Sequence, residues 1–98
     1  MNLANDLQNK DLDTQLKDEM ALGHKAEAAY EGYVKDHVAY TNQRLYQEFL
    51  STSVTETDRI LEIKRLQSAL RGLEISILND IETGKMAAKQ FNTLYKGE

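Results

Sequence analysis

"TETDRILEIKRLQSALRGLEISILNDIETGK", residues 55–85, carries apolar side chains at the spacing of a coiled coil. Ile63, Leu66, Leu70, Leu73 and Ile77 follow one another at steps of three, four, three and four residues. Such steps place the side chains in one seam along a helix. The pattern therefore predicts a long helix from about 55 to 83 whose seam packs against another helix.

The seam changes phase in its last third. Asp80 stands where the next apolar residue is due, and Ile81 follows it instead. An extra step of this kind predicts a stutter, which relaxes supercoiling locally. Gly84 then has two interpretations: it ends the helix, or it is an interior glycine at a close contact with another backbone. Because residues 85–96 favour helix, we expect a kink or a short break and then helix to about 95.

A corner precedes this helix at residues 51–55. The stretch "STSVTET" at 51–57 is rich in hydroxyl and β-branched residues, which favour turns and caps over helix interiors. Ser53 with Glu56, or Thr55 with Asp58, offers the capping-box spacing. Both registers predict that the helix begins near residues 54–56.

The half of the chain before the corner predicts another long helix, over about 24–50, with a broad apolar stripe. The stripe comprises Ala26, Tyr30, Tyr33, Val34, His37, Val38, Thr41, Leu45 and Phe49. Residues 1–22 are acidic and polar with a weaker helical pattern, so we expect a short helix or an arm there. Residues 23–98 then form one hairpin.

The predicted fold is all-α: an antiparallel hairpin of two long helices, completed by oligomerisation. A pair of helices shares one seam and encloses little core, and small chains with incomplete cores need further support. The second helix also carries Leu61, Ile75 and Leu78 off its seam, with the small residues Ser68 and Gly72 between them. Tyrosines in the first helix serve either core packing or an interface. The predicted interface residues are Tyr30, Tyr33, Tyr40, Leu61, Leu66, Leu70, Leu73, Ile75, Ile77, Leu78 and Ile81.

Nothing in the sequence indicates catalysis, a cofactor or a metal site. The 98 residues contain no cysteine, and the two histidines, His24 and His37, lie more than three helical turns apart. We expect His37, on the apolar stripe, to be a core or interface histidine. No nucleotide-binding, zinc-protease or hydrolase motif is present. We therefore expect a protein that is not an enzyme. With no signal-peptide pattern and no apolar run of membrane-spanning length, we place it in the cytoplasm.

The charge is unevenly distributed. Residues 1–50 carry nine acidic and five basic side chains, whereas residues 51–98 carry seven of each. The basic residues Arg59, Lys64, Arg65 and Arg71 alternate with acidic ones, which is typical of a solvated helix face and makes nucleic-acid binding unlikely. DNA binding would require these four side chains to gather on one face of an oligomer.

The block at 52–87, "TSVTETDRILEIKRLQSALRGLEISILNDIETGKMA", resembles a pattern in small uncharacterised proteins of tailed-bacteriophage genomes. The shared elements are the Thr/Ser corner, Thr57-Asp58-Arg59, the leucines at 66, 70 and 73, and the closing Glu82-Thr83-Gly84-Lys85. The resemblance implies an all-helical fold and a phage or prophage origin, in the host cytoplasm or the virion, but carries no site residues.

Two functions are compatible with these features. The first is a non-catalytic homo-oligomeric helical protein that acts in particle assembly or genome packaging, with phage structural proteins as further partners. The alternative is a small acidic inhibitor that binds a host factor such as a defence nuclease or polymerase, because an acidic helix can imitate a phosphate backbone.

Overall fold

The computed structural model describes the backbone of residues 3–96 and the side chains of residues 11–95. Within these bounds the chain is helical apart from a short connection at 52–56. The elements are α1 (Leu3–Ala29), the π-helical segment η1 (Tyr30–Val34), α2 (Lys35–Ser51) and α3 (Thr57–Lys96). The molecule is a thin rod of 72 × 25 × 17 Å. The predicted all-α class is confirmed.

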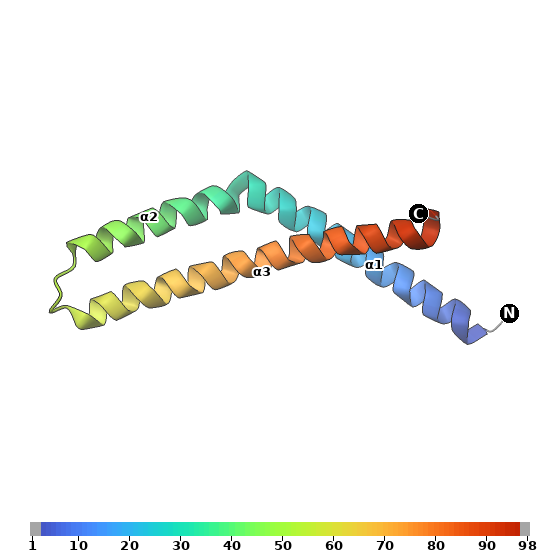
Figure 1. The fold of residues 1–98 in the computed structure, drawn as a ribbon, viewed down its shortest axis with the longest axis horizontal. Coiled ribbons are helices and arrows are strands. Elements are labelled where there is room, and N and C mark those ends of the chain that lie inside the picture. Colours follow the sequence, from blue (N-terminus) through green and yellow to red (C-terminus); the bar gives the residue numbers. More distant parts are fainter. Residues whose placement is uncertain (1–2, 97–98) are drawn as a thin grey trace.

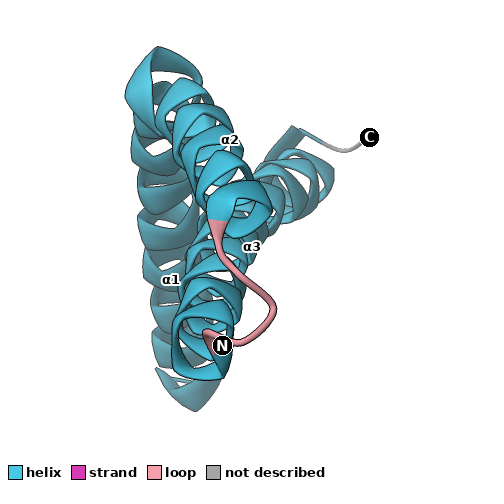
Figure 2. Ribbon diagram, turned by 90° about the vertical axis from the view of Figure 1, so that its left-hand side faces the viewer, coloured by secondary structure: helices cyan, strands magenta, loops and turns pink. Residues whose placement is uncertain are grey.

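The helices α1 and α2 form one nearly continuous helical half, and α3 runs back along it in the opposite direction (Figure 1). The chain changes direction at η1, so that α1 crosses α3 at an angle while α2 lies beside the first half of α3 (Figures 1 and 2). Most long-range contacts of α3 are with α1, and far fewer are with α2. The rod is therefore packed more closely near its crossing than near its corner.

The first half of the chain differs from the expected arm followed by a helix from residue 24. Of the predicted arm 1–22, residues 1 and 2 lie outside the described residues, and the rest belongs to α1, which continues without a break through Gly23 and His24. Leu16 and Met20 lie on the same face as Gly23 and are buried or half-buried. Contact with α3 on this face supports helix where sequence propensity alone is weak.

The backbones of α1 and α3 meet at Gly23 and Gly84. A Cβ atom built on either glycine would lie 2.7 Å from the Cα atom of the other. Only glycine allows two helix backbones to meet at this distance, because any side chain would push them apart. Of the two interpretations of Gly84, the interior glycine under a close contact is correct, and α3 passes through it without a stop.

The face that α3 turns towards the rest of the chain follows a regular heptad spacing over its whole length. Its buried and half-buried members are Ile60, Ile63, Gln67, Leu70, Glu74, Ile77, Ile81, Gly84, Ala88 and Phe91, and the buried Ala87 lies beside this line. The steps alternate between three and four residues throughout, so this internal seam has no stutter. The expected stutter was wrong because the seam passes through Gln67 and Glu74 instead of Leu66 and Leu73.

The opposite side of the seam, in α1 and α2, contains the phase change. Leu16, Gly23 and Tyr30 stand seven residues apart, as do Val38, Leu45 and Thr52, but eight residues separate Tyr30 from Val38. All six are buried or half-buried. The additional residue lies in η1, where the Lys35 amide donates to the Tyr30 carbonyl, five residues back. A π segment accommodates one inserted residue, so η1 keeps both halves of this helix facing α3.

The shift at η1 removes three residues from the predicted stripe of the first helix. Tyr33, His37 and Phe49 are exposed, whereas Val38 and Leu45 are buried. His37 stacks on Tyr33, with 5.3 Å between ring centroids, and lies outside the core. Of the two roles predicted for His37, the core role is wrong because a constant helical period was carried across a π segment, and the interface role stays a prediction.

The corner differs from the predicted capping box. The Ser53 hydroxyl accepts from the Thr55 amide at 3.3 Å and lies 3.0 Å from the Thr55 hydroxyl. The Ile60 amide donates to the Glu56 carbonyl, which makes Glu56 the N-cap of α3. At the other side of the corner, the Ser51 and Thr52 hydroxyls both donate to the Glu48 carbonyl and close α2. Local side-chain hydrogen bonds therefore build a tight turn at 52–56.

Deletion of one residue tests the role of η1. Gly32 lies in the π segment and Gly72 lies in α3, and a Cβ atom at either would meet nothing within 4 Å. Deleting Gly32 restores the seven-residue spacing, so we expect a cooperatively folded protein with an unchanged or higher melting temperature by circular dichroism. Deleting Gly72 moves half of the α3 seam out of phase, and we expect melting at least about 10 °C lower. Equal losses in both variants would contradict this role of η1.

Substitution at the crossing tests the glycine contact. Gly84→Ala places a methyl group against the backbone of α1, so we expect a loss of about 1–3 kcal/mol in the free energy of unfolding. Gly72→Ala is the matched control, because it meets open space and should gain about 0.5–1 kcal/mol from helix propensity. Chemical denaturation measures both changes. An equal gain at both positions would show that the helices do not cross at Gly84.

Candidate interaction surface

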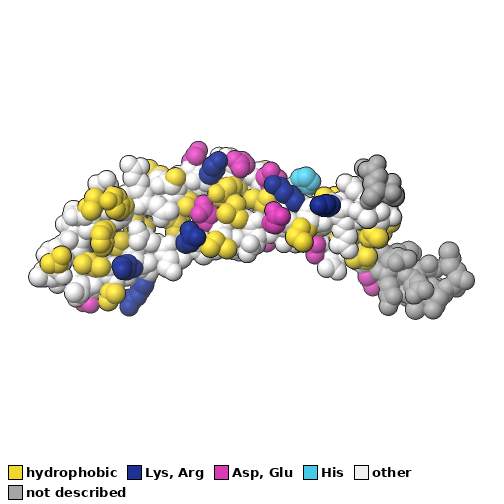
Figure 3. Space-filling view, viewed as in Figure 1, with side chains coloured by type: hydrophobic (Ala, Val, Ile, Leu, Met, Phe, Trp, Pro, Cys, Tyr) yellow, Lys and Arg dark blue, Asp and Glu magenta, His cyan; other side chains and the backbone are white. Residues whose placement is uncertain are grey.

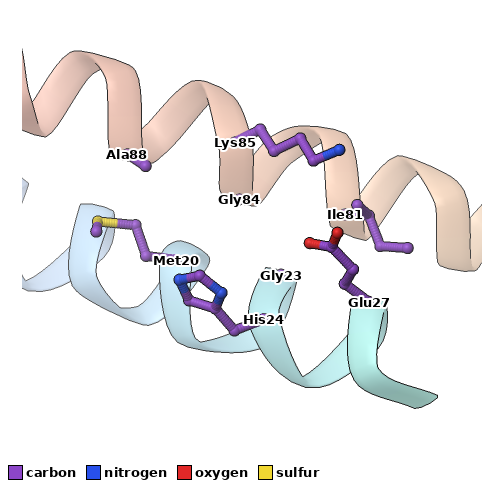
Figure 4. A pocket seen from close by; sticks show the side chains of 8 residues that line it. All are labelled: Met20, Gly23, His24, Glu27, Ile81, Gly84, Lys85 and Ala88. Atoms are coloured by element: carbon purple, nitrogen blue, oxygen red, sulfur yellow. The ribbon is translucent and has the colours of Figure 1, made fainter. Parts of the chain in front are cut away.

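A small pocket beside the glycine crossing is the most enclosed of the hollows described. It holds about 60 Å³ and is lined by Met20, Gly23, His24, Glu27, Ile81, Gly84, Lys85 and Ala88. Figure 4 shows Gly23 and Gly84 facing one another across it, with Glu27 pointing from α1 towards α3. Ligand sites usually have volumes of about 300–1,000 Å³. This pocket is a packing gap next to a close helix crossing.

The described side chains do not assemble a metal site: among residues 11–95, no group of three His, Asp or Glu residues lies close enough to bind an ion. The two histidines differ in position, since His24 lines the crossing pocket and His37 lies on the exposed side of α2. Over the part of the chain that the structure describes, no helix is both long and apolar enough to cross a membrane.

A larger apolar groove lies between α2 and α3. It has a volume of about 300 Å³ and is lined by Thr41, Arg44, Leu45, Leu66, Ala69, Leu70 and Leu73. A second, more polar hollow shares Arg44, Leu45 and Leu66 with it and extends towards the corner as far as Arg59. The two hollows form one continuous groove, which exists because α2 lies against α3 more loosely than α1 does.

Leu66 and Leu73 form the outer wall of this groove. They are 45% and 57% exposed, whereas Ile63, in the internal seam, is fully buried. Of the predicted seam, Leu66 and Leu73 therefore do not pack on the first helix, and their assignment to an interface with another chain stays a prediction. The glycine crossing sets the rotation of α3, and this rotation turns Gln67 and Glu74 inward and Leu66 and Leu73 outward.

The remaining predicted interface residues fall into three groups. Ile81 is buried, and Tyr30, Leu70 and Ile77 are half-buried in the internal seam. Tyr33 of η1 and Tyr40 of α2 are exposed. Leu61, Ile75 and Leu78 are exposed on α3, on a side that does not line the groove. Hydrophobic side chains lie along much of the face in Figure 3, among scattered charged ones.

The sequence analysis missed several contributors to this surface. Thr41, Arg44 and Ala69 line the groove, and Tyr46, Leu50 and Met86 are exposed large side chains elsewhere. Exposure of a single residue leaves no pattern in a sequence. The small side chains of Thr41 and Ala69, opposite one another in an antiparallel pair, are the one signal that could have indicated the groove.

The basic residues of α3 do not form one cationic face. Arg59 pairs with Glu48 of α2 and with Glu62, whose oxygen lies 2.9 Å from the guanidinium. Lys64 and Arg71 share one line of the helix, while Arg59 and Arg65 lie on two others, as their spacing in an α-helix requires. This arrangement lacks the clustered basic patch that usually accompanies phosphate binding.

Tyr30 and Glu74 form a polar pair inside the internal seam. The Tyr30 hydroxyl donates to Glu74 Oε2 at 3.1 Å. Burial raises the pKa of Tyr30, and the hydrogen bond to Glu74 and the charges of Glu74 and Glu31 raise this pKa further. The pair satisfies a carboxylate that the rotation of α3 brings into the seam.

No family model, curated protein or solved structure matches the chain. The surface is accordingly interpreted from its own geometry.

The Tyr30–Glu74 pair predicts a pH dependence of stability. Because the folded state raises the pKa of Tyr30 above 10.0, its contribution is complete below pH 10 and is lost as the pH rises through the raised value. We expect wild-type stability to fall more steeply above pH 10 than that of Tyr30→Phe, in urea denaturation series at each pH. Tyr40→Phe, at an exposed tyrosine, is the control and should follow the wild type. Parallel curves for all three proteins would contradict this role of Tyr30.

Proposed function

We propose that this protein is a non-catalytic helical module that works by self-association, as a building block in phage particle assembly or genome packaging. The structure favours association of the hairpin with further copies of itself over ligand binding or catalysis. The observation that carries the proposal is the apolar surface that the single chain leaves open.

The balance of buried and exposed apolar groups supports self-association. In the described part of the chain six apolar side chains are buried, while fifteen large ones are exposed. Scattered exposed apolar residues are ordinary, but a continuous groove flanked by leucines at heptad spacing is typical of a helix interface. A chain of this size gains little from its own core, so a further helix against the groove would add a large share of its stability.

The assembly or packaging role rests on the resemblance of residues 52–87 to small proteins of tailed-bacteriophage genomes. Phage particles are built from many copies of few proteins, and a rod with an apolar side suits such repetition. For the alternative of a host-factor inhibitor, the acidic surface is weakened at Asp13 and Glu31, which pair with Lys17 and Lys35 one helical turn further on.

Molar mass in solution tests the proposal. We expect light scattering on a sizing column to give a molar mass that rises with protein concentration towards a defined multiple of the 11.2 kDa chain mass. The double variant Leu66→Gln/Leu73→Gln should shift this equilibrium towards the single chain, since it places two amides at the groove. Leu61→Gln/Ile75→Gln is the matched control, because these residues are similarly exposed but do not line the groove.

A wild-type protein that stays at the mass of one chain at all concentrations would refute self-association. A wild-type oligomer that is lost only in the control pair would assign the interface to the opposite side of α3.

A further inference from the structure

The outward side of α3 carries a second heptad line that the chain itself does not cover. Arg59, Leu66, Leu73 and Asp80 stand seven residues apart, so they lie along one line of the helix with only a slow drift. The line is about 30 Å long at the rise of an α-helix. Its two central members wall the groove, and its ends carry opposite charges.

Ile63, Leu70 and Ile77 of the internal seam lie directly beside this line. Together with Leu66 and Leu73, these residues form an entirely apolar seam on α3, whereas the seam used inside the chain includes Gln67 and Glu74. A helix with two adjacent seams is typical of bundles, in which each helix contacts two neighbours. The chain supplies one neighbour for α3: Ile63 is fully buried and Leu70 and Ile77 are half-buried, whereas Leu66 and Leu73 remain exposed for a second neighbour.

We propose that this seam binds α3 of a second copy of the chain in antiparallel orientation, across a two-fold axis near Ala69 and Leu70. This proposal rests on the proposed self-association and specifies its interface. In this register Leu66 of each copy faces Leu73 of the other. The partner's α3 lies along the groove between α2 and α3, so the two copies form a four-helix arrangement.

Charge complementarity selects this orientation. Arg59 precedes Leu66 by seven residues and Asp80 follows Leu73 by seven, so the register that pairs the leucines also pairs Arg59 of each copy with Asp80 of the other. A parallel, in-register pair would instead place Arg59 against Arg59 and Asp80 against Asp80. Like charges at facing positions disfavour that pairing.

The surroundings of the line fit a second helix. The small side chains Ala69 and Ser76 lie on the outer flank of the seam, where they allow a close approach. Both charged ends are half-buried and retain accessible surface. Arg59 contacts Glu48 and Glu62 within its own chain, and its five N–H donors allow a further carboxylate to join that cluster.

Disulfide formation between single-cysteine variants tests the register, because the natural chain contains no cysteine. Leu66→Cys carrying an affinity tag is mixed with untagged Leu73→Cys under mild oxidation. We expect the mixed disulfide to exceed either self-linked species by about tenfold. Facing positions bring Cβ atoms within the 3.5–4.5 Å that a disulfide needs, whereas identical positions are displaced by seven residues, about 10 Å along the helix.

Reversal of one charge provides a second readout. In the symmetric pair, Asp80→Lys creates two contacts between like charges, one with Arg59 of each copy. We therefore expect the dissociation constant of the variant to be about tenfold above that of the wild type at low salt, and this difference to shrink at high salt. Glu82→Lys, which lies off the line, is the matched control and should leave the dissociation constant unchanged. Circular dichroism verifies that both variants are folded.

The outcomes separate the two proposals. Self-linkage of Leu66→Cys, or a dimer by light scattering that forms no mixed disulfide, would overturn the antiparallel register and leave self-association standing. A wild-type chain that remains monomeric would remove both. The interface would be established by a mixed disulfide between Leu66→Cys and Leu73→Cys together with a dissociation constant that rises for Asp80→Lys but not for Glu82→Lys.

Discussion

The contact between Gly23 and Gly84 determines most of what surrounds it. The two backbones meet so closely that a Cβ atom on either would lie 2.7 Å from the Cα atom of the other, which fixes the rotation of α3 about its own axis. From that point the heptad spacing extends along α3 to Ile60 without interruption. Gln67 and Glu74 are thereby brought into the internal seam, and Leu66 and Leu73 are left exposed at the outer wall of the groove between α2 and α3.

The segment η1 is the second consequence of this geometry. A helix that faces α3 at Gly23 and again at Leu45 needs one more residue than whole heptads provide, and the π segment holds that residue. Kinks in long helices commonly occur at such segments. Here the change of direction lets α1 cross α3 closely while α2 lies more loosely beside it, and the groove is the result (Figure 1).

These two features bear directly on function. The chain keeps the polar residues Gln67 and Glu74 in its internal seam and leaves Leu66 and Leu73 outside it. Each of these leucines remains partly in water until another helix covers it, which favours association. The polar interior pair of Tyr30 and Glu74 is satisfied by its own hydrogen bond, so no ligand is required there. In the proposed antiparallel pair, the charged ends of the outer line, Arg59 and Asp80, would select the direction of the second copy. The molecule therefore combines a tightly packed helix crossing at Gly23 and Gly84 with an exposed apolar groove between α2 and α3.

The sequence alone was sufficient for the all-α class, the corner near 51–56 and a long heptad helix after it, because these depend on local spacing and on the absence of helix breakers. Its predicted interface residues on α3 include Leu66 and Leu73, which are exposed, but also Leu70, Ile77 and Ile81, which lie in the internal seam. What it could not decide was which residues of that heptad face inward. Ile63, Leu66, Leu70, Leu73 and Ile77 form the better apolar pattern, yet the structure chooses Gln67 and Glu74 over two of the leucines. That choice comes from a backbone contact between residues sixty-one positions apart and from one inserted residue in η1, and neither leaves a periodic signal. Local sequence sets where helices form, whereas the closest long-range contact sets how they are turned.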